Sequence, residues 1–154
     1  MTAAIVRLGS GDLPDFSNLV ALARDEGYLF LTRAEAEWID GSNRFDKPGE
    51  GLFLARIGSE SVGIAGLNVD PFLEDPTVGR LRRVYVAPEV RGAGIGGDLV
   101  RACIGSAASH FSRVRLRAEN PDAARLYERL GFVAVEETEA THSIEISNVA
   151  ISGD

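Results

Sequence analysis

The residues with the clearest chemical potential are four glycines that come just before a helical pattern. They lie within six residues, directly after Arg91, at Gly92, Gly94, Gly96 and Gly97. Glycine lets the backbone turn sharply, and the first N–H groups of a helix have no partner inside that helix. A turn of this kind offers several donors and the positive end of a helix dipole to an anion. Phosphate binding is therefore the chemistry to examine first.

A P-loop is one phosphate-binding motif to compare with this turn. It needs a lysine and a hydroxyl residue directly after its last glycine, and Gly92 and Gly97 have the required glycine spacing. Asp98 and Leu99 follow instead, and a carboxylate at residue 98 would repel a triphosphate. The sequence therefore excludes a P-loop.

The dinucleotide-binding fingerprint G-x-G-x-x-G is a second comparison, and Gly92, Gly94 and Gly97 match it. Glu119 also follows the last of these glycines at about the expected distance. However, the first glycine of the fingerprint should come directly after its strand, whereas five residues separate Gly92 from the strand that ends at Val86. The chain is also too short for two mononucleotide-binding halves. A dinucleotide-dependent oxidoreductase remains the weaker alternative.

A third pattern, R-x-x-G-x-G, fits the turn from Arg91 to Gly96, which follows the apolar strand 84–86. About 25 residues further on, residues 120–132 read N-x-x-A-x-x-L-Y-E-x-L-G-F. Together these two motifs resemble the acyl-CoA-binding turn and the following helix of the GNAT N-acetyltransferase superfamily. The matched motifs cover residues 84–132, and the expected order of elements along the whole chain also suits the family.

The resemblance implies an enzyme that transfers the acetyl group of acetyl-CoA directly to a primary amine, without a metal. The pyrophosphate would bind N–H groups of the Arg91–Gly96 turn, and the pantetheine arm would pair with the backbone of Val84 and Val86. Asn120 would contact the pantetheine with its side chain while its backbone serves the helix cap. The implied cofactor-binding residues are Val84, Tyr85, Val86, Arg91, Gly92, Ala93, Gly94, Ile95, Gly96, Asn120, Ala123 and Tyr127.

Tyr127 is the catalytic residue that the resemblance implies, as general acid to the departing CoA thiolate. It lies four residues after Ala123, so both side chains share one helix face. Reference pKa values of about 8.5 for a thiol and about 10 for a phenol make full proton transfer uphill by about 2 kcal/mol. We therefore expect Tyr127 to act mainly as a hydrogen-bond donor to the sulfur. The structural alternative is a core tyrosine with a satisfied hydroxyl.

The sequence does not identify the general base. Many family members have a glutamate near the start of the motif strand, where this chain has Arg80, Arg82 and Arg83. The base would then be a carboxylate elsewhere or a water chain, unless the acceptor amine has a low pKa. Candidates by their position at strand ends are Asp70, Glu74, Asp75 and Glu145, with His142 as a weaker one.

Strands and helices must position these residues, and the apolar spacing predicts eleven elements. The expected strands are 3–8, 52–57, 62–69, 78–87, 114–118, 132–137 and 141–148, and the expected helices are 13–26, 32–40, 94–108 and 121–130. Asp12 is the predicted N-cap of the first helix, Thr32 and Glu35 form a predicted capping box for the second, and Asn120 precedes Pro121 as the cap of the last. The fold class is α/β (α+β): a mixed, mostly antiparallel sheet of about seven strands, with helices on both faces and, by the resemblance, a splayed cofactor groove.

Composition limits the remaining possibilities. The 154 residues suit one acetyltransferase domain, 1–154, and a net charge of −7 argues against nucleic-acid and membrane partners. A single cysteine excludes a disulfide framework, and with no long apolar run and no signal peptide we expect a cytoplasmic protein, monomer or homodimer. Residues 80–129 carry ten arginines and five acids, a basic segment suited to the phosphates of CoA. The acceptor would be a small-molecule or peptide amine; a non-catalytic acyl-CoA sensor is the other alternative.

Overall fold

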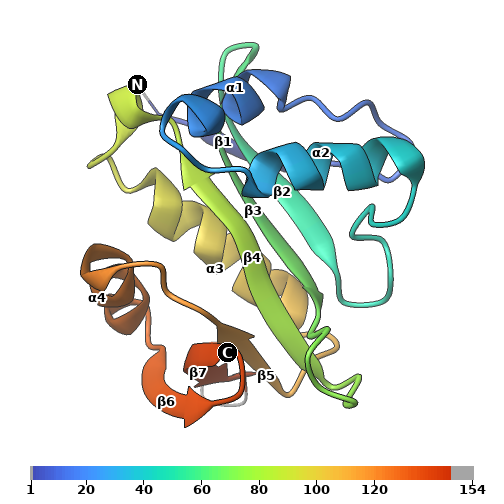
Figure 1. Cartoon of the computed structure of the whole chain (residues 1–154), viewed down its shortest axis with the longest axis vertical. Coiled ribbons are helices and arrows are strands. Elements are labelled where there is room, and N and C mark those ends of the chain that lie inside the picture. Colours follow the sequence, from blue (N-terminus) through green and yellow to red (C-terminus); the bar gives the residue numbers. More distant parts are fainter. Residues whose placement is uncertain (1, 147–154) are drawn as a thin grey trace.

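The seven strands form one sheet in the order β1-β2-β3-β4-β5-β7-β6 (Figure 1). The computed structural model describes residues 2–146, so residues 147 and 148 of the expected last strand lie outside the described residues. The strands are β1 (Ala4–Arg7), β2 (Gly51–Ile57), β3 (Glu60–Val69), β4 (Val78–Val86), β5 (Arg113–Leu116), β6 (Val133–Glu137) and β7 (Ala140–Glu145). The helices are α1 (Ser17–Asp25), α2 (Phe30–Asp40), the short 3₁₀ helix η1 (Pro88–Val90), α3 (Ile95–Ala107) and α4 (Pro121–Arg129). The predicted fold class and order of elements are confirmed.

The sheet splits between β4 and β5. These two strands pair in parallel over only three positions, from Val78 with Arg113 to Arg80 with Arg115, while all other neighbouring strands are antiparallel. β4 then continues to Val86, whereas β5 ends at Leu116 and stays paired with β7 (Figure 1). Because the strands diverge after their first contacts, the sheet is open along the second half of β4.

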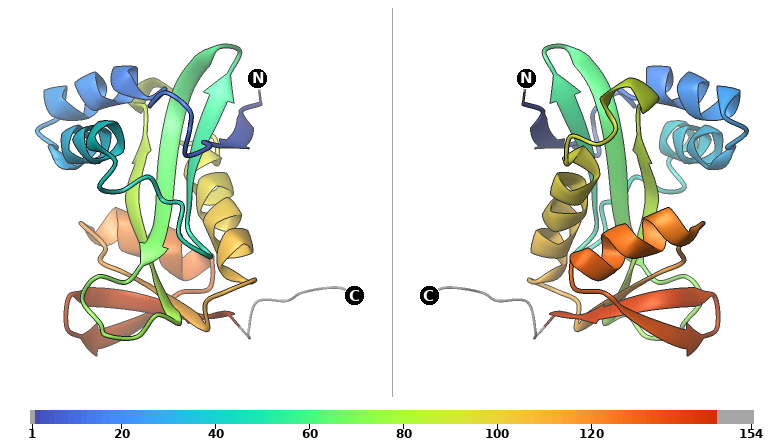
Figure 2. Two further views of the ribbon diagram at one scale, coloured as in Figure 1. Left: turned by 90° about the vertical axis from the view of Figure 1, so that its right-hand side faces the viewer. Right: turned by 90° about the vertical axis from the view of Figure 1, so that its left-hand side faces the viewer.

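The two faces of the sheet carry different helices. Figure 2 shows α1 and α2 on one face and α3 on the other. Along β4, Leu81 packs into the core under α3, and Val84 and Val86 pack against the same core. Tyr85 belongs to the core under α1 and α2. The alternation of side chains along β4 therefore divides the strand between the two cores.

A bulge in β4 lies at the start of its free half. Ile64 of β3 pairs with Tyr85, and Gly66 pairs with Arg82, so two steps along β3 oppose three along β4. Arg83 sits at this extra position with a φ of 61°, in the left-handed region. A bulge bends its strand and re-aims the neighbouring side chains. Both Arg82, by alternation with Leu81, and Arg83, through its contact with α2, lie on the face of α1 and α2.

The predicted start of the first helix is wrong. α1 begins at Ser17, and the Asp12 carboxylate accepts a hydrogen bond from the Gly9 N–H at 2.8 Å instead of capping the helix. The indole N–H of Trp38 donates to the Asp12 carbonyl oxygen at 2.9 Å. This contact between residues far apart in the sequence holds the segment before Ser17 as a turn.

The predicted capping box of the second helix is also wrong. α2 begins at Phe30, which places Thr32 and Glu35 inside the helix. The Thr32 hydroxyl accepts a hydrogen bond from Arg24, and Glu35 accepts one from the Ser17 hydroxyl. Phe30 packs edge-on against the ring of Tyr85, so tertiary packing extends the helix beyond its local start signal. Within residues 2–146, no helix is long and apolar enough to cross a membrane.

Candidate active site

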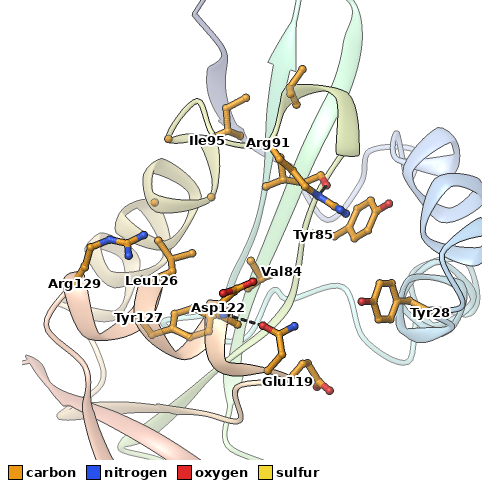
Figure 3. A pocket seen from close by; sticks show the side chains of 18 of the residues that line it. Tyr28, Val84, Tyr85, Arg91, Ile95, Glu119, Asp122, Leu126, Tyr127 and Arg129 are labelled. Atoms are coloured by element: carbon orange, nitrogen blue, oxygen red, sulfur yellow. Dashed lines mark hydrogen bonds between the residues drawn. The ribbon is translucent and has the colours of Figure 1, made fainter.

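A groove of about 740 Å³ opens where β4 and β5 diverge (Figure 3). Its walls come from the free half of β4, the turn before α3, the start of α4 and the loop between α1 and α2. Every predicted cofactor-binding residue lines this groove except Ala93. The lining also includes Tyr28 and Phe30 from the α1–α2 side, together with Val90, Gly97, Arg117, Glu119, Asp122, Leu126 and Arg129.

The turn before α3 presents backbone donors to the groove. Gly94 is the N-cap residue with a φ of 85°, and Gly92 has a φ of 87°, so both need the left-handed conformation that glycine adopts freely. A Cβ at either position would meet no atom within 4 Å. No side chain of the described residues caps α3, and its first N–H groups have no partner within the helix. The turn therefore has both the open space and the free donors that a pyrophosphate requires.

The Arg91 side chain is already engaged within the groove. Its two terminal nitrogens donate to the Glu26 carboxylate at 2.7 and 3.0 Å, and its Nε donates to the Val86 carbonyl oxygen at 2.9 Å. The Tyr85 hydroxyl also donates to Glu26, and Figure 3 shows Arg91 reaching towards the Tyr85 ring. The hydrogen bond from Arg91 lowers the pKa of Glu26, and the same bond raises the pKa of Arg91. Burial, together with Glu26, raises the pKa of Tyr85 to about 12.

Tyr127 lies on α4 with its ring buried against Phe132 at a centroid distance of 5.8 Å. Its side chain lines the groove, and no hydrogen bond within residues 2–146 engages its hydroxyl. Burial raises its pKa to about 12, with smaller contributions from Cys103 and Glu119. Tyr127 is therefore a protonated donor at neutral pH whose O–H is available to a ligand.

Asn120 caps α4 with its side chain, not with its backbone alone. Its Oδ1 accepts a hydrogen bond from the Ala123 N–H at 2.9 Å, and Pro121 occupies the first helical position. The predicted cap is confirmed, but the expectation that the side chain is left free for the cofactor is wrong for its oxygen. The Nδ2 amide group is the part of Asn120 that can still donate to a ligand at the groove.

The predicted base candidates do not line the groove. The Asp70 carboxylate is buried at the start of the β3–β4 loop, where Arg115 donates to it at 2.9 Å and Arg80 at 3.4 Å. Asp75 accepts hydrogen bonds from Thr77, and His142 lies buried with its Nε2 2.8 Å from Glu128. Glu74 and Glu145 are exposed and lie outside the groove lining.

Two other carboxylates line the groove. Asp122 forms a salt bridge with Arg125, whereas Glu119 has no salt bridge within the described part of the chain. Glu119 also lies near enough to Tyr127 to affect its pKa. In the sequence, only the dinucleotide fingerprint draws attention to Glu119. No sequence pattern draws attention to Glu26.

Most of the arginines in the basic segment are neutralised by neighbouring acids. Of the ten arginines between residues 80 and 129, eight form salt bridges within residues 2–146, and Arg82 and Arg129 do not. Arg129 lines the groove from α4, as Figure 3 shows. The expected excess of positive charge is thus concentrated at Arg129 on the groove and at Arg82 on the other face of β4.

An open mixed sheet that splits beside a helix N-terminus, with a tyrosine side chain in the split, is the arrangement that the resemblance to the GNAT superfamily predicted. The model of the acetyltransferase (GNAT) family matches residues 15–132, and the chain belongs to this family.

Individual relatives agree with this assignment. The chain is 26% identical over 138 residues to an uncharacterized N-acetyltransferase of Methanocaldococcus jannaschii, an alignment that covers 85% of this chain and spans 61% of that protein's length. It is 28% identical to a protein of Exiguobacterium sp. 255-15, itself provisionally assigned as an acetyltransferase, with a TM-score of 0.85 and full coverage of both chains. The fold is also that of a GNAT family N-acetyltransferase from Escherichia coli solved in complex with CoA (19% identity, TM-score 0.69, 99% of this chain and 86% of that one).

Proposed function

We propose that this protein transfers the acetyl group of acetyl-CoA directly to a primary amine of a small-molecule or peptide acceptor. The observation that carries the proposal is that the groove holds both the N-terminus of α3, which no side chain of residues 2–146 caps, and the Tyr127 hydroxyl, which has no hydrogen-bond partner among those residues. Acetyl-CoA supplies the acetyl group as a thioester with a thiol leaving group. The CoA-bound relative from Escherichia coli, which shares the fold, supports this choice of cofactor.

The groove residues suit the parts of acetyl-CoA that they would hold. The N–H groups of the turn would bind the pyrophosphate, and the guanidinium of Arg129, which forms no salt bridge within residues 2–146, would bind a further phosphate. The backbone of Val84, in the free half of β4, would pair with the pantetheine. The Val86 carbonyl already accepts a bond from Arg91, but a carbonyl oxygen has two lone pairs and can accept a second.

An acceptor ammonium must lose two protons, one before the amine attacks and one as the amide forms, and the CoA thiolate must gain one. As the N–C bond forms and the C–S bond breaks, the Tyr127 hydroxyl donates a hydrogen bond to the sulfur, where negative charge develops. Removing a proton from a lysine-like amine at pH 7 costs about 4.6 kcal/mol. Glu119 is the groove carboxylate whose charge no salt bridge within residues 2–146 neutralises, so we assign it the role of accepting that proton, directly or through water.

Calorimetric titration with acetyl-CoA and with NADH, followed by an amine panel assayed for released thiol, tests the proposal. We expect binding of acetyl-CoA, none of NADH, and acetylation of at least one amine. Binding of NADH alone would favour the oxidoreductase alternative. Binding of acetyl-CoA without thiol release from any amine would favour a non-catalytic sensor.

A further inference from the structure

Three aromatic residues line the side of the groove that α1 and α2 border. Tyr28 lies in the loop between these helices, Phe30 begins α2, and Tyr85 comes from β4. The rings of Tyr28 and Phe30 have centroids 5.8 Å apart, and those of Phe30 and Tyr85 are 6.3 Å apart, edge to face. Figure 3 shows Tyr28 reaching into the groove from this side, across from Tyr127 on α4. We call Tyr28, Phe30 and Tyr85 the aromatic wall.

Tyr28 is the member of the aromatic wall that core packing does not account for. Phe30 and Tyr85 pack in the core under α1 and α2, whereas Tyr28 belongs to neither core and is 41% exposed. An exposed ring at a groove offers a ligand apolar area to cover and the negative face of its π system. The aromatic wall can therefore bind an apolar or aromatic group that comes from outside the chain.

The aromatic wall lies on the side of the groove that acetyl-CoA would leave open. The pyrophosphate would bind the turn before α3, and the Tyr127 hydroxyl would reach the sulfur from α4. The pantetheine would pair with the free half of β4 between these two points. The acceptor amine then approaches the thioester from the remaining side, which is the side of Tyr28 and Phe30.

The charges of the groove favour a cationic acceptor that has no carboxylate. Glu119 lines the groove without a salt bridge in the described part of the chain, so an ammonium group is attracted to it, as it is to aromatic faces. The arginines of the lining do not offer a site for a carboxylate beside the aromatic wall. Arg91 and Arg117 are paired with acids, and Arg129 lies on α4, where it would bind a phosphate of CoA.

We propose that the acceptor is a small aromatic amine, with a primary amine on a short alkyl chain attached to an aromatic ring and no carboxylate. The ring would pack against Tyr28 and Phe30, and the amine would face the thioester and Glu119. A peptide would also need partners for its backbone, and the free half of β4 is assigned to the pantetheine. The inference rests on the proposed acetyl transfer and names its substrate class.

Four amines test the inference. The wild-type protein, saturated with acetyl-CoA, is assayed for thiol release with 2-phenylethylamine, 2-cyclohexylethylamine, ethylamine and L-phenylalanine. We expect kcat/KM for 2-phenylethylamine to exceed that for ethylamine about tenfold or more, because ethylamine lacks the ring. It should exceed that for L-phenylalanine by a similar factor, because Glu119 repels the carboxylate. The cyclohexyl amine, with a ring of similar size but no π system, should be about threefold worse.

A matched pair of variants tests the role of Tyr28. Tyr28→Ala should lower the ratio of kcat/KM for 2-phenylethylamine to that for ethylamine about fivefold or more, because the ring loses its packing partner. Leu29→Ala removes a neighbouring exposed side chain that does not line the groove, and it should keep the ratio.

The outcomes separate the two proposals. If acetyl-CoA does not bind, the proposed function itself fails. If acetyl-CoA binds but any of the other three amines matches 2-phenylethylamine, or the ratio survives Tyr28→Ala, only the aromatic-amine inference is overturned. Phenylalanyl-glycinamide overturns it too, in favour of a peptide, if its kcat/KM is higher after correction for the lower pKa of its amine.

A binding measurement decides the case in which none of these amines is acetylated. N-acetyl-2-phenylethylamine, the product of the proposed reaction, is titrated into the CoA-saturated protein. Binding that Tyr28→Ala weakens and Leu29→Ala preserves supports the aromatic site. Absence of binding, or binding that Tyr28→Ala leaves unchanged, overturns it.

Discussion

The Glu26 carboxylate and the Arg91 guanidinium form a two-bond ion pair, at 2.7 and 3.0 Å, between residues 65 positions apart in the sequence. It joins the end of α1 to the turn before α3, so the α1–α2 wall of the groove is tied to the proposed pyrophosphate site. The hydroxyl of Tyr85 completes the contact from β4. Acetyl-CoA would therefore meet an arginine whose charge is already balanced.

Glu26→Gln should strengthen the binding of acetyl-CoA. The substitution removes the charge that balances Arg91, so the turn presents a more positive field to the phosphates. We expect the Kd from calorimetry to fall about threefold at low salt, with the difference shrinking as salt rises. Asp25→Asn, an equal change in charge one residue away, has no salt bridge to break within residues 2–146 and should have a smaller effect. Weaker binding in Glu26→Gln would show that the ordering of Arg91 matters more than its charge.

Tyr127→Phe should lower kcat much more than it weakens acetyl-CoA binding. The hydroxyl has no hydrogen-bond partner within residues 2–146, so its proposed partner is the sulfur in the transition state. Removal of one such donor typically costs about 10²-fold in kcat. Thermal unfolding provides the internal control, because loss of an unpaired hydroxyl should leave stability nearly unchanged. An unaltered kcat would remove Tyr127 from the mechanism.

Two substitutions of Asn120 separate its structural role from a contact with the cofactor. Asn120→Ala removes the cap on the Ala123 N–H and should cost about 1 kcal/mol of unfolding free energy. Asn120→Asp keeps an oxygen for the cap and should keep that stability, but it loses the Nδ2 donor. We expect both variants to bind acetyl-CoA more weakly and only the alanine variant to unfold earlier in urea. Full affinity in Asn120→Asp would leave Asn120 a purely structural residue.

Asp70→Asn should destabilise the fold strongly. The Asp70 side chain is fully buried, and its charge compensates Arg115, which is 1% exposed, and Arg80. Breaking a buried pair by removing one partner costs about 3–5 kcal/mol, because the other charge stays buried. Urea denaturation measures the loss, and Asp75→Asn, which alters an exposed carboxylate in the same loop, should change little. A loss well under 1 kcal/mol would mean that Glu137 alone can satisfy Arg115.

The parts of the site that the sequence predicted are local in the chain. The turn from Arg91 to Gly96 and the cap at Asn120 depend on residues a few positions apart, and the glycines could be interpreted from their spacing alone. The start of α2 could not, because Phe30 joins the helix by packing on Tyr85, far away in the sequence.

The pairing of charges was the other property that could not be predicted from the sequence. The ten arginines of residues 80–129 suggested a basic surface, but which of them keeps a free charge depends on acids such as Glu26, Asp70 and Glu139, which lie outside that segment. Only the three-dimensional arrangement separates Arg82 and Arg129 from the paired arginines. No sequence pattern connects Arg91 to Glu26.

Between neutral pH and pH 10, kcat/KM should rise with pH and should not fall again. Deprotonation of the acceptor amine raises kcat/KM as pH increases, whereas Tyr127, with its pKa raised to about 12, stays protonated through pH 10. The rate ratio of wild type to Tyr127→Phe should thus stay constant from pH 7 to 10 in stopped assays. Above pH 10 the unfolded chain loses tyrosine protons before the folded chain does. The free energy of unfolding therefore falls between pH 10 and 12, and for this reason the assays stop at pH 10. A ratio that collapsed between pH 8 and 10 would mean that Tyr127 ionises early, and the donor to the sulfur would have to be another group.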